Sequence, residues 1–279
     1  MNKKIHTIVC DLDGTLLNEK NEISKFNLSI IQRTINLGIQ FIIATGRRYF
    51  CVLPYLSLFQ GKIQVIANNG QILKEYPENI TIVENFLKNE IVAVLYQKII
   101  EEGFFPVLNV DWLEKEIDLI LQESSCYVER YRNNPRAMII SNLEEVNLDR
   151  VTVVYTHAQD IQALYSLALK LQPYIQQQNL RILMTKIPNL GPCLEILPDN
   201  ISKWTGVEIF LQRNNQDPDG VLAFGDEAND LEMIQKSGLG VAMKNAILEL
   251  KKNAKMVSSY SNSEDGVGKM IQKIIFSKI

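Results

Sequence analysis

The segment Asp11-Leu12-Asp13-Gly14-Thr15 directly follows an apolar run, Ile8-Val9-Cys10, near the start of the chain. Two carboxylates that stand two positions apart on an extended segment project to the same side, and a glycine lets the chain turn away after them. Asp11 and Asp13 are therefore expected together at the end of a strand, where α/β sheets bind ligands. One such carboxylate can attack a phosphorus atom while the other handles the proton of the leaving oxygen.

Two simpler interpretations of this motif stay open when it is taken alone. Aspartate and glycine after a strand often make only a turn. A calcium loop is the other alternative, because Glu22 stands where such a loop places its last ligand. The glycine comes two positions too early for that loop, and Thr15 occupies the third carboxylate position, so calcium is disfavoured.

Composition predicts an ordinary soluble globular protein and gives no electrostatic case for a large anionic partner. Of the 279 residues 46% are hydrophobic and 22% charged, and the net charge of −3 favours neither nucleic acid nor an anionic membrane. No apolar run is long enough to span a bilayer. The four cysteines lack CxxC spacing, which indicates mostly buried thiols in a reducing cytoplasm. The only histidines, His6 and His157, argue against a zinc site or a histidine-based triad.

Strands and helices alternate at the start of the chain. Ile5–Cys10, Ile39–Ala44 and Lys62–Ala67 are predicted as buried strands, because they are short apolar runs rich in β-branched residues. A helix capped by Ser24 is expected between the first two strands, and another from about Tyr49. This alternation predicts a parallel sheet with right-handed crossovers.

The pattern changes in the middle of the chain. Helices are predicted over Glu90–Glu102, Leu113–Ser124 and Ile161–Leu171, and strands over Phe104–Val110 and Arg150–Thr156. We interpret residues 81–191 as an inserted α+β domain; the alternative is that this region continues the first sheet. Strands then return at Val221–Phe224, Leu239–Met243 and Lys255–Val257, so residues 1–80 and 192–279 are expected to form one α/β core, a Rossmann-like parallel sheet.

Polar clusters follow three separate predicted strands. Asp11 and Asp13 follow the first, Thr45-Gly46 follows the second, and Gly225-Asp226-Glu227-Ala228-Asn229-Asp230 ends a much later one. The carboxyl ends of parallel strands converge on one edge of a sheet, so a shared site is expected there. Phosphoryl transfer explains the residue types, because a divalent cation must offset the repulsion between an attacking carboxylate and a phosphate.

The residues of these clusters suit the parts of such a site. Mg²⁺ prefers oxygen ligands, which Asp11, the backbone carbonyl of Asp13 and Asp226 could provide. Lys203 could neutralise negative charge as a compact cation. The remaining polar groups suit the phosphate oxygens or a metal-bound water, and they are the Thr45 hydroxyl, the Gly46 amide and the Asn229 side chain.

Four motifs in this order resemble those of the haloacid dehalogenase superfamily. They are DxDGT at 11–15, TGR at 45–47, a lysine at 203, and GDxxND at 225–230. Further segments resemble its Cof-type branch, subclass IIB, at 69–70, 240–246 and 264–267. The resemblance covers about 1–80 and 192–279, and the middle region matches the branch's α/β cap domain by length and position. One departure is that Trp204 and Thr205 follow the lysine, where the branch has glycine and a small residue.

The resemblance implies a role for each matching position. Asp11 would be the nucleophile that becomes an aspartyl-phosphate, and Asp13 would protonate the leaving alkoxide and then activate water. Phosphate binding would fall to Thr45, Gly46, Lys203 and Asn229. Mg²⁺ would be held by Asp11, Asp13 and Asp226, with Asp230 supporting Lys203 or a metal-bound water from behind.

The sequence therefore predicts a Mg²⁺-dependent, cytoplasmic phosphatase of small phosphorylated metabolites, sugar phosphates above all, acting as a monomer or small homo-oligomer. The inserted domain is expected to close over substrate and to select the leaving group, with Asp111-Trp112 and Asn189-Leu190-Gly191 as candidate contacts. Two other functions stay open. One is a phosphomutase that returns the phosphoryl group to a sugar, and the other is a non-catalytic sugar-phosphate sensor.

Overall fold

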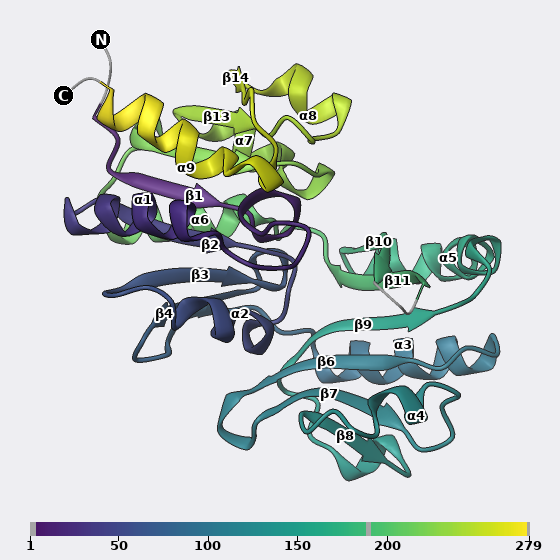
Figure 1. Cartoon of the computed structure of the whole chain (residues 1–279). Helices are drawn as coiled ribbons and strands as arrows, with labels where there is room; N and C mark the ends of the chain where they lie inside the picture. Colours follow the sequence, from purple (N-terminus) through teal and green to yellow (C-terminus); the bar gives the residue numbers. More distant parts are fainter. Residues whose placement is uncertain (1–3, 188–190, 278–279) are drawn as a thin grey trace. The chain divides into compact units, whose positions relative to one another are not determined.

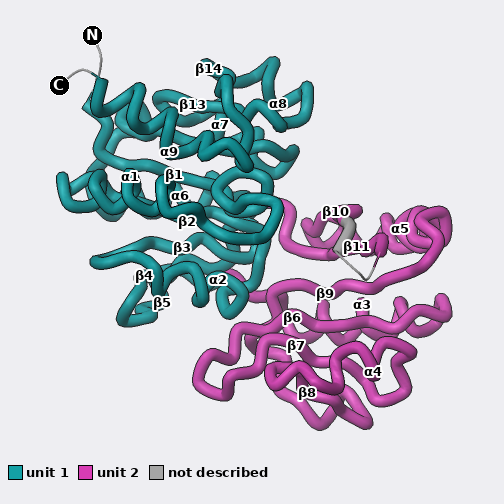
Figure 2. The backbone as a smooth tube through the Cα atoms, viewed as in Figure 1, with its two compact units in different colours: residues 1–84, 201–279 teal, residues 85–200 magenta. Residues whose placement is uncertain are grey.

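The computed structural model describes residues 4–187 and 191–277, and the chain divides into two compact units. Unit 1 combines Met1–Glu84 with Ile201–Ile279, and unit 2 is Asn85–Asn200 (Figure 2). Unit 2 is therefore an insertion between two halves of unit 1. Asn189 and Leu190, two of the candidate contacts, lie outside the described residues.

Unit 1 is built on one eight-stranded sheet. In spatial order its strands are β14 (Met256–Val257), β13 (Leu239–Ala242), β12 (Val221–Gly225), β1 (Thr7–Cys10), β2 (Gln40–Ala44), β3 (Ile63–Ala67), β4 (Ile72–Tyr76) and β5 (Ile80–Glu84). The six strands from β14 to β3 are parallel, as predicted for the core. Strands β1, β3 and β12 are buried throughout, which explains why they read as continuous apolar runs.

The sheet departs from the sequence prediction at one edge, where β4 and β5 run antiparallel and were not foreseen. The turn from β3 into β4 contains Asn68, Asn69 and Gly70, all with positive φ angles. Asparagine and glycine tolerate this conformation, so the chain can reverse within a few residues instead of crossing over through a helix.

Helices cover both faces of this sheet. They are α1 (Lys25–Asn36), α2 (Tyr49–Leu56), α6 (Lys203–Arg213), α7 (Leu231–Lys236), α8 (Leu248–Asn253) and α9 (Gly266–Ile271). Helix α1 packs against α9, and α6 packs against α7 (Figure 1). The predicted cap of α1 is confirmed, since the Ser24 side chain accepts a hydrogen bond from the Asn27 amide, and α2 begins at Tyr49 as expected.

Unit 2 has a separate six-stranded sheet with three helices (Figure 1). Its strands, in spatial order, are β10 (Leu180–Ile187), β11 (Gly191–Pro198), β9 (Val151–His157), β6 (Val107–Trp112), β7 (Ile117–Gln122) and β8 (Ala137–Ile140). Its helices are α3 (Asn89–Glu101), α4 (Val128–Tyr131) and α5 (Ile161–Gln177). Strand pairing is antiparallel except between β7 and β8, so unit 2 does not continue the first sheet.

The helix predicted over Leu113–Ser124 is wrong, because this stretch forms a short turn and strand β7. Leu113, Ile117 and Leu121 fit a helical spacing, but a short apolar run fits a strand equally well. Glu116, with a φ of 55°, interrupts any helix before the strand begins. Burial in the sheet decides the outcome, since four consecutive residues of β7 are buried.

The predicted domain boundaries need correction at both ends. Residues 81–84 belong to unit 1 because β5 pairs with β4, and residues 192–200 belong to unit 2 because β11 pairs with β10 and β9. Pairing with strands that are distant in the sequence sets both boundaries, so the local sequence pattern does not indicate where they lie.

Two further sequence expectations concern the thiols and membranes. Cys10 and Cys193 are buried, but Cys51 is half-buried and Cys126 is exposed, so the expectation of mostly buried thiols is only half right. Cys126 lies in the connection after β7, which packs less tightly than a strand. None of the helices within 4–187 and 191–277 has both the length and the apolar character that crossing a bilayer requires.

Candidate active site

The site begins where strand β1 ends, in the middle of the unit 1 sheet. Asp11 directly follows β1, and its backbone amide donates to the carbonyl of Phe224 on the neighbouring strand β12. Its side chain is almost fully buried. Gly14, with a φ of 72°, then turns the chain out of the sheet. A carboxylate that is usually exposed is thus held at the buried carboxyl end of a central strand.

Lys203 lies between two of the buried carboxylates. Its Nζ atom donates to Oδ1 of Asp11 at 2.6 Å and to Oδ1 of Asp230 at 2.7 Å, and its side chain is only 2% exposed. Lys203 is the first residue of α6, whose start is fixed by the Ser202 side chain accepting from the Thr205 amide. Trp204 does not disturb this start, since it packs into the core with 1% exposure.

Asp226 completes the carboxylate cluster from strand β12. Its Oδ1 atom accepts a hydrogen bond from the Thr15 hydroxyl at 2.7 Å. Its other oxygen lies against Gly14, where a Cβ atom would approach it to 2.2 Å. Only glycine therefore fits between the turn and this carboxylate, which explains the Gly-Thr pair after the two aspartates.

Asp230 already has hydrogen-bond partners for both carboxylate oxygens. Oδ1 accepts from Lys203, and Oδ2 accepts from the backbone amides of Asp226 and Glu227 at 2.9 and 3.1 Å. This geometry fixes the loop after β12 and orients the lysine. Asp230 therefore links the lysine to the loop after β12.

The cluster is electrostatically unbalanced. Burial raises the pKa of Asp11 well above its usual range, although the nearby Lys203 ammonium opposes the shift. Burial also raises the pKa of Asp226 to about 6, against the hydrogen bond from Thr15. Burial lowers the pKa of Lys203, but Asp11 and Asp230 outweigh it and leave this pKa above its ordinary value. Three carboxylates share one ammonium, so a further positive charge would stabilise the ionised site.

The residues present fit a hard divalent cation. Asp11, Asp226 and Asp230 each offer a carboxylate oxygen within 4.8 Å of the others. Within the described residues, no group donates to Oδ2 of Asp11 or of Asp226. Carboxylate oxygens of two buried aspartates without a hydrogen-bond donor are the kind of ligand that Mg²⁺ and similar ions prefer. Asp230 is the least available ligand of the three because its oxygens are already occupied.

The second predicted cluster lies after strand β2. Thr45 is buried, and its hydroxyl oxygen accepts from the Arg47 amide at 3.1 Å, as in a tight turn. Asn69 lies beside Gly46, 3.2 Å from where its Cβ would be, and accepts a hydrogen bond from Asn229 at 2.9 Å. This contact joins the ends of β3 and β12. Asn69 was noted in the sequence only as a family feature, without a role.

Arg47 is the residue that the sequence reasoning most clearly missed. Its Nε atom donates to Oδ2 of Asp13 at 2.7 Å, and its Nη2 atom bonds the other carboxylate oxygen. Its Nη1 atom donates to the Tyr55 hydroxyl at 3.2 Å. The Asp13 side chain is more exposed than that of Asp11, and the Arg47 guanidinium holds it in place. The signal was present in the TGR motif, of which only Thr45 and Gly46 were given a role.

Comparison with known proteins agrees with this fold. The profile of the haloacid dehalogenase-like hydrolases matches residues 8–271, nearly the whole chain. A haloacid dehalogenase-like hydrolase from Bacteroides thetaiotaomicron has a similar structure, with 28% sequence identity and a TM-score of 0.82 over 98% of this chain and all of that one. The chain belongs to the haloacid dehalogenase-like hydrolase family, in its Cof-type branch, and it is a phosphatase.

Two relatives show how far the similarity extends. The 5-amino-6-(5-phospho-D-ribitylamino)uracil phosphatase YitU of Bacillus subtilis is 27% identical over 278 residues, which cover 98% of each chain. The chloroplastic endoribonuclease YBEY of Arabidopsis thaliana is 26% identical over 286 residues, 98% of this chain and 47% of that protein. The chain spans about half the length of the Arabidopsis protein, whose named activity belongs to that longer protein.

Proposed function

We propose that this protein hydrolyses phosphate monoesters of small metabolites through a phosphoryl group carried on Asp11, with Mg²⁺ bound at Asp11 and Asp226. The observation that carries the proposal is the buried Asp11 carboxylate, which is hydrogen-bonded to Lys203 on one oxygen and free on the other. The Asp13 carbonyl is the proposed third protein ligand of the ion. When bound, Mg²⁺ would offset the repulsion between the phosphate and the Asp11 carboxylate.

In the first step, a carboxylate oxygen of Asp11 attacks the phosphorus atom, and the bond from phosphorus to the leaving oxygen breaks. Asp13, in its protonated form, gives its proton to that oxygen, so an alcohol leaves. Lys203 stabilises the negative charge on the transferring oxygens. Thr45, the Gly46 amide and Asn229 are proposed to bind the same phosphate oxygens.

In the second step, Asp13 takes a proton from water while the water oxygen attacks phosphorus. The bond between phosphorus and the Asp11 oxygen breaks, which releases inorganic phosphate and restores both aspartates. Arg47 holds Asp13 by two hydrogen bonds in this structure. These bonds orient the Asp13 carboxylate, which is the group that accepts the proton from water.

Sugar phosphates are the proposed substrate class. The relative YitU is named for a phosphate ester on a ribityl group, which is a sugar alcohol. We assign the choice of leaving group to unit 2, which is inserted as a separate fold between the two halves of the catalytic unit. We also propose that the protein works in the cytoplasm, as a monomer or small homo-oligomer, on free metabolites.

A phosphomutase and a sugar-phosphate sensor are the rival functions. A mutase would return the phosphoryl group to a sugar, and its product would be an isomerised sugar phosphate without free phosphate. A sensor would bind sugar phosphates without turnover. The buried carboxylates favour an enzyme over a sensor, because a pure binder gains little from a cluster that burial destabilises.

The test is release of inorganic phosphate from a panel of phosphorylated sugars, nucleotides, cofactors and an aryl phosphate. Each substrate is assayed with Mg²⁺, with a chelator, and with the variant Asp11→Asn. Asp118→Asn is the matched control, since Asp118 is an equally buried aspartate in unit 2. Mg²⁺-dependent release that only Asp11→Asn abolishes supports the proposal. Unchanged turnover in Asp11→Asn would contradict it.

A further inference from the structure

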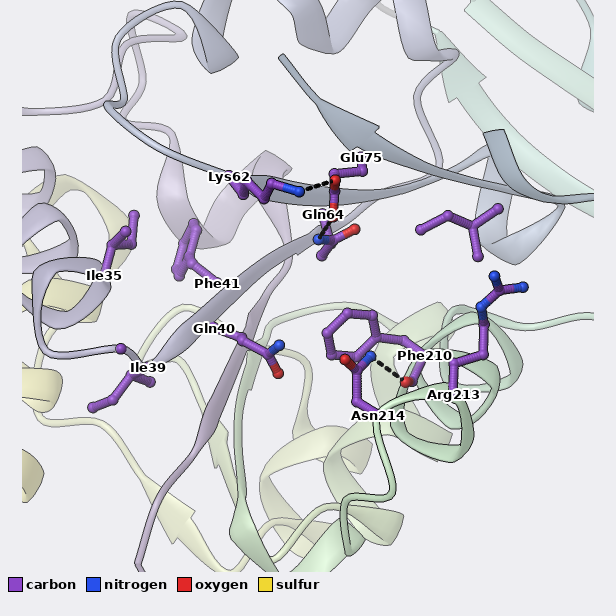
Figure 3. Close-up of a pocket in the computed structure, with 12 residues that line it drawn as sticks. Ile35, Ile39, Gln40, Phe41, Lys62, Gln64, Glu75, Phe210, Arg213 and Asn214 are labelled. Carbon is purple, nitrogen blue, oxygen red and sulfur yellow. Dashed lines mark hydrogen bonds and ion pairs between the residues drawn. The ribbon is translucent and has the colours of Figure 1, made fainter. Parts of the chain in front are cut away.

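A cavity of about 440 Å³ lies in unit 1 (Figure 3). It is at the amino end of strand β2, whereas the catalytic residues follow the carboxyl ends of the parallel strands. Gln40 is the first residue of β2, whereas Thr45 directly follows the last one. Arg213 is the last residue of α6, whereas Lys203 is the first. Eleven helical residues place the two ends of α6 about 15 Å apart. The cavity is therefore separate from the active site but shares two elements with it.

The cavity contains an unpaired, buried hydrogen-bond acceptor. Gln64 is 7% exposed, and its Nε2 atom donates to Oε2 of Glu75 at 2.9 Å. This bond to a carboxylate fixes which end of the amide is the oxygen. The Oε1 atom accepts no hydrogen bond from any described residue and is shielded from solvent. A buried carbonyl without a partner is unfavourable, so a donor that reaches it is stabilised there.

The lining also contains an unpaired cation. Lys62 is neutralised by Glu75, which its Nζ atom contacts at 2.6 Å. Arg213 is exposed and has no acceptor among residues 4–187 and 191–277. The cavity lining therefore has an excess of one positive charge. In Figure 3 the Arg213 side chain extends from the end of its helix beside the cavity. A guanidinium in this state is suited to a carboxylate or phosphate.

Apolar side chains line the rest of the space. The ring of Phe210 is buried and lies between Arg213 and the Gln40 side chain in Figure 3. Phe41, also buried, contributes a second aromatic wall. Cavities of several hundred cubic ångströms with apolar walls and a few convergent polar groups are typical of small-molecule sites.

We propose that this cavity is a second binding site, for a small organic anion that has an apolar body and one N–H or O–H donor. The anionic group would pair with Arg213, the donor would bond Oε1 of Gln64, and the apolar body would pack on Phe210. Binding there does not require phosphate at Asp11. Because α6 joins Arg213 to Lys203, an occupied cavity can alter the position of the catalytic lysine.

The test uses 4-hydroxybenzoate as the probe, with binding measured by titration calorimetry on the full chain. Benzoate lacks the donor, and 4-hydroxybenzamide lacks the charge. We expect Arg213→Gln to weaken 4-hydroxybenzoate binding by about tenfold. Gln64→Leu should remove the preference for 4-hydroxybenzoate over benzoate. Lys252→Gln, which removes an exposed positive charge from the same unit, is the control and should leave affinity unchanged.

Two results would overturn the proposal. These are no saturable binding of 4-hydroxybenzoate, or equal binding of it by the wild type and Arg213→Gln. If Gln64→Leu fails to fold, the comparison of 4-hydroxybenzoate with benzoate on the wild type still tests the donor. If 4-hydroxybenzoate still binds Asp11→Asn, this site is separate from the proposed catalytic function, because probe binding is measured without turnover.

Discussion

Each unit has a buried polar cluster, and the two clusters differ in charge. In unit 1, Asp11 and Asp230 pair with the ammonium of Lys203, and Asp226 lies beside the two carboxylates. In unit 2, the His157 ring has edge contacts with Tyr155 at 5.2 Å between ring centroids, and the Tyr131 hydroxyl lies 3.2 Å from that of Tyr155.

The difference in charge indicates that the unit 1 cluster is suited to chemistry and the unit 2 cluster to packing. Burial lowers the pKa of His157 to about 4, so this cluster is neutral at physiological pH. Neutral rings bury apolar area at little electrostatic cost. The carboxylates of unit 1 are unfavourable without a cation, so their burial is explained by what they bind and not by the stability they add. The predictions below test this contrast.

The largest effect is expected for Lys203→Met. Removing the ammonium leaves buried carboxylates without their ion pair, so the free energy of unfolding should fall by about 3–5 kcal/mol. Urea denaturation followed by circular dichroism measures it. Lys255→Met is the matched control, because the Nζ atom of Lys255 donates only to backbone carbonyls and its loss should cost about 1 kcal/mol. Equal losses in both variants would contradict the contrast.

The neutral cluster should respond to acid. Because the folded state lowers the pKa of His157, protonation favours unfolding, and stability is lost as pH falls from about 6.5 to 4. The loss is at most about 3 kcal/mol. NMR titration of the ring Cε1–H signals should show one histidine with a pKa near 4, and His157→Gln should remove it. If His6→Gln removes that signal instead, the assignment is wrong.

Metal binding should stabilise only the charged cluster. At 100 times the dissociation constant, Mg²⁺ should raise the free energy of unfolding by about 2.7 kcal/mol, because it binds the folded state. Thermal unfolding with and without Mg²⁺ measures this as a higher midpoint. Asp226→Asn should lose the shift. Glu264→Gln, an exposed carboxylate of unit 1 paired with Lys244, should keep it. A shift retained in Asp226→Asn would place the ion elsewhere.

The smallest change in stability is expected for Arg47→Met. Its pair with Asp13 is partly exposed, so the free energy of unfolding should change by less than about 1 kcal/mol. The turnover number should fall, since Asp13 loses the group that orients it. Arg132→Met removes a comparable exposed pair with Glu129 in unit 2 and should change stability as little, with no effect on turnover. A fall in turnover for both variants would mean that the effect is not local.

Much of the fold could be predicted because it depends on local pattern. Strands β1, β2 and β3 are short apolar runs, and Ser24 caps α1 through a residue three positions away. The order of strands and helices then implied a parallel core. Strand β7 could not be predicted, because its spacing fits a helix and only pairing with β6 and β8 selects the strand. The unit boundaries failed for the same reason.

For the site, the sequence by itself determined which chemical groups are available and that three of the clusters follow strands. Tertiary structure alone decided which groups meet. Lys203 contacts Asp11 across 192 positions of sequence, and Arg47 donates to the carboxylate of Asp13 across 34 positions. The unpaired Gln64 oxygen likewise exists only in the folded chain. Local propensity depends on neighbours in sequence, whereas charge pairing and burial depend on neighbours in space, which only the packed sheet defines.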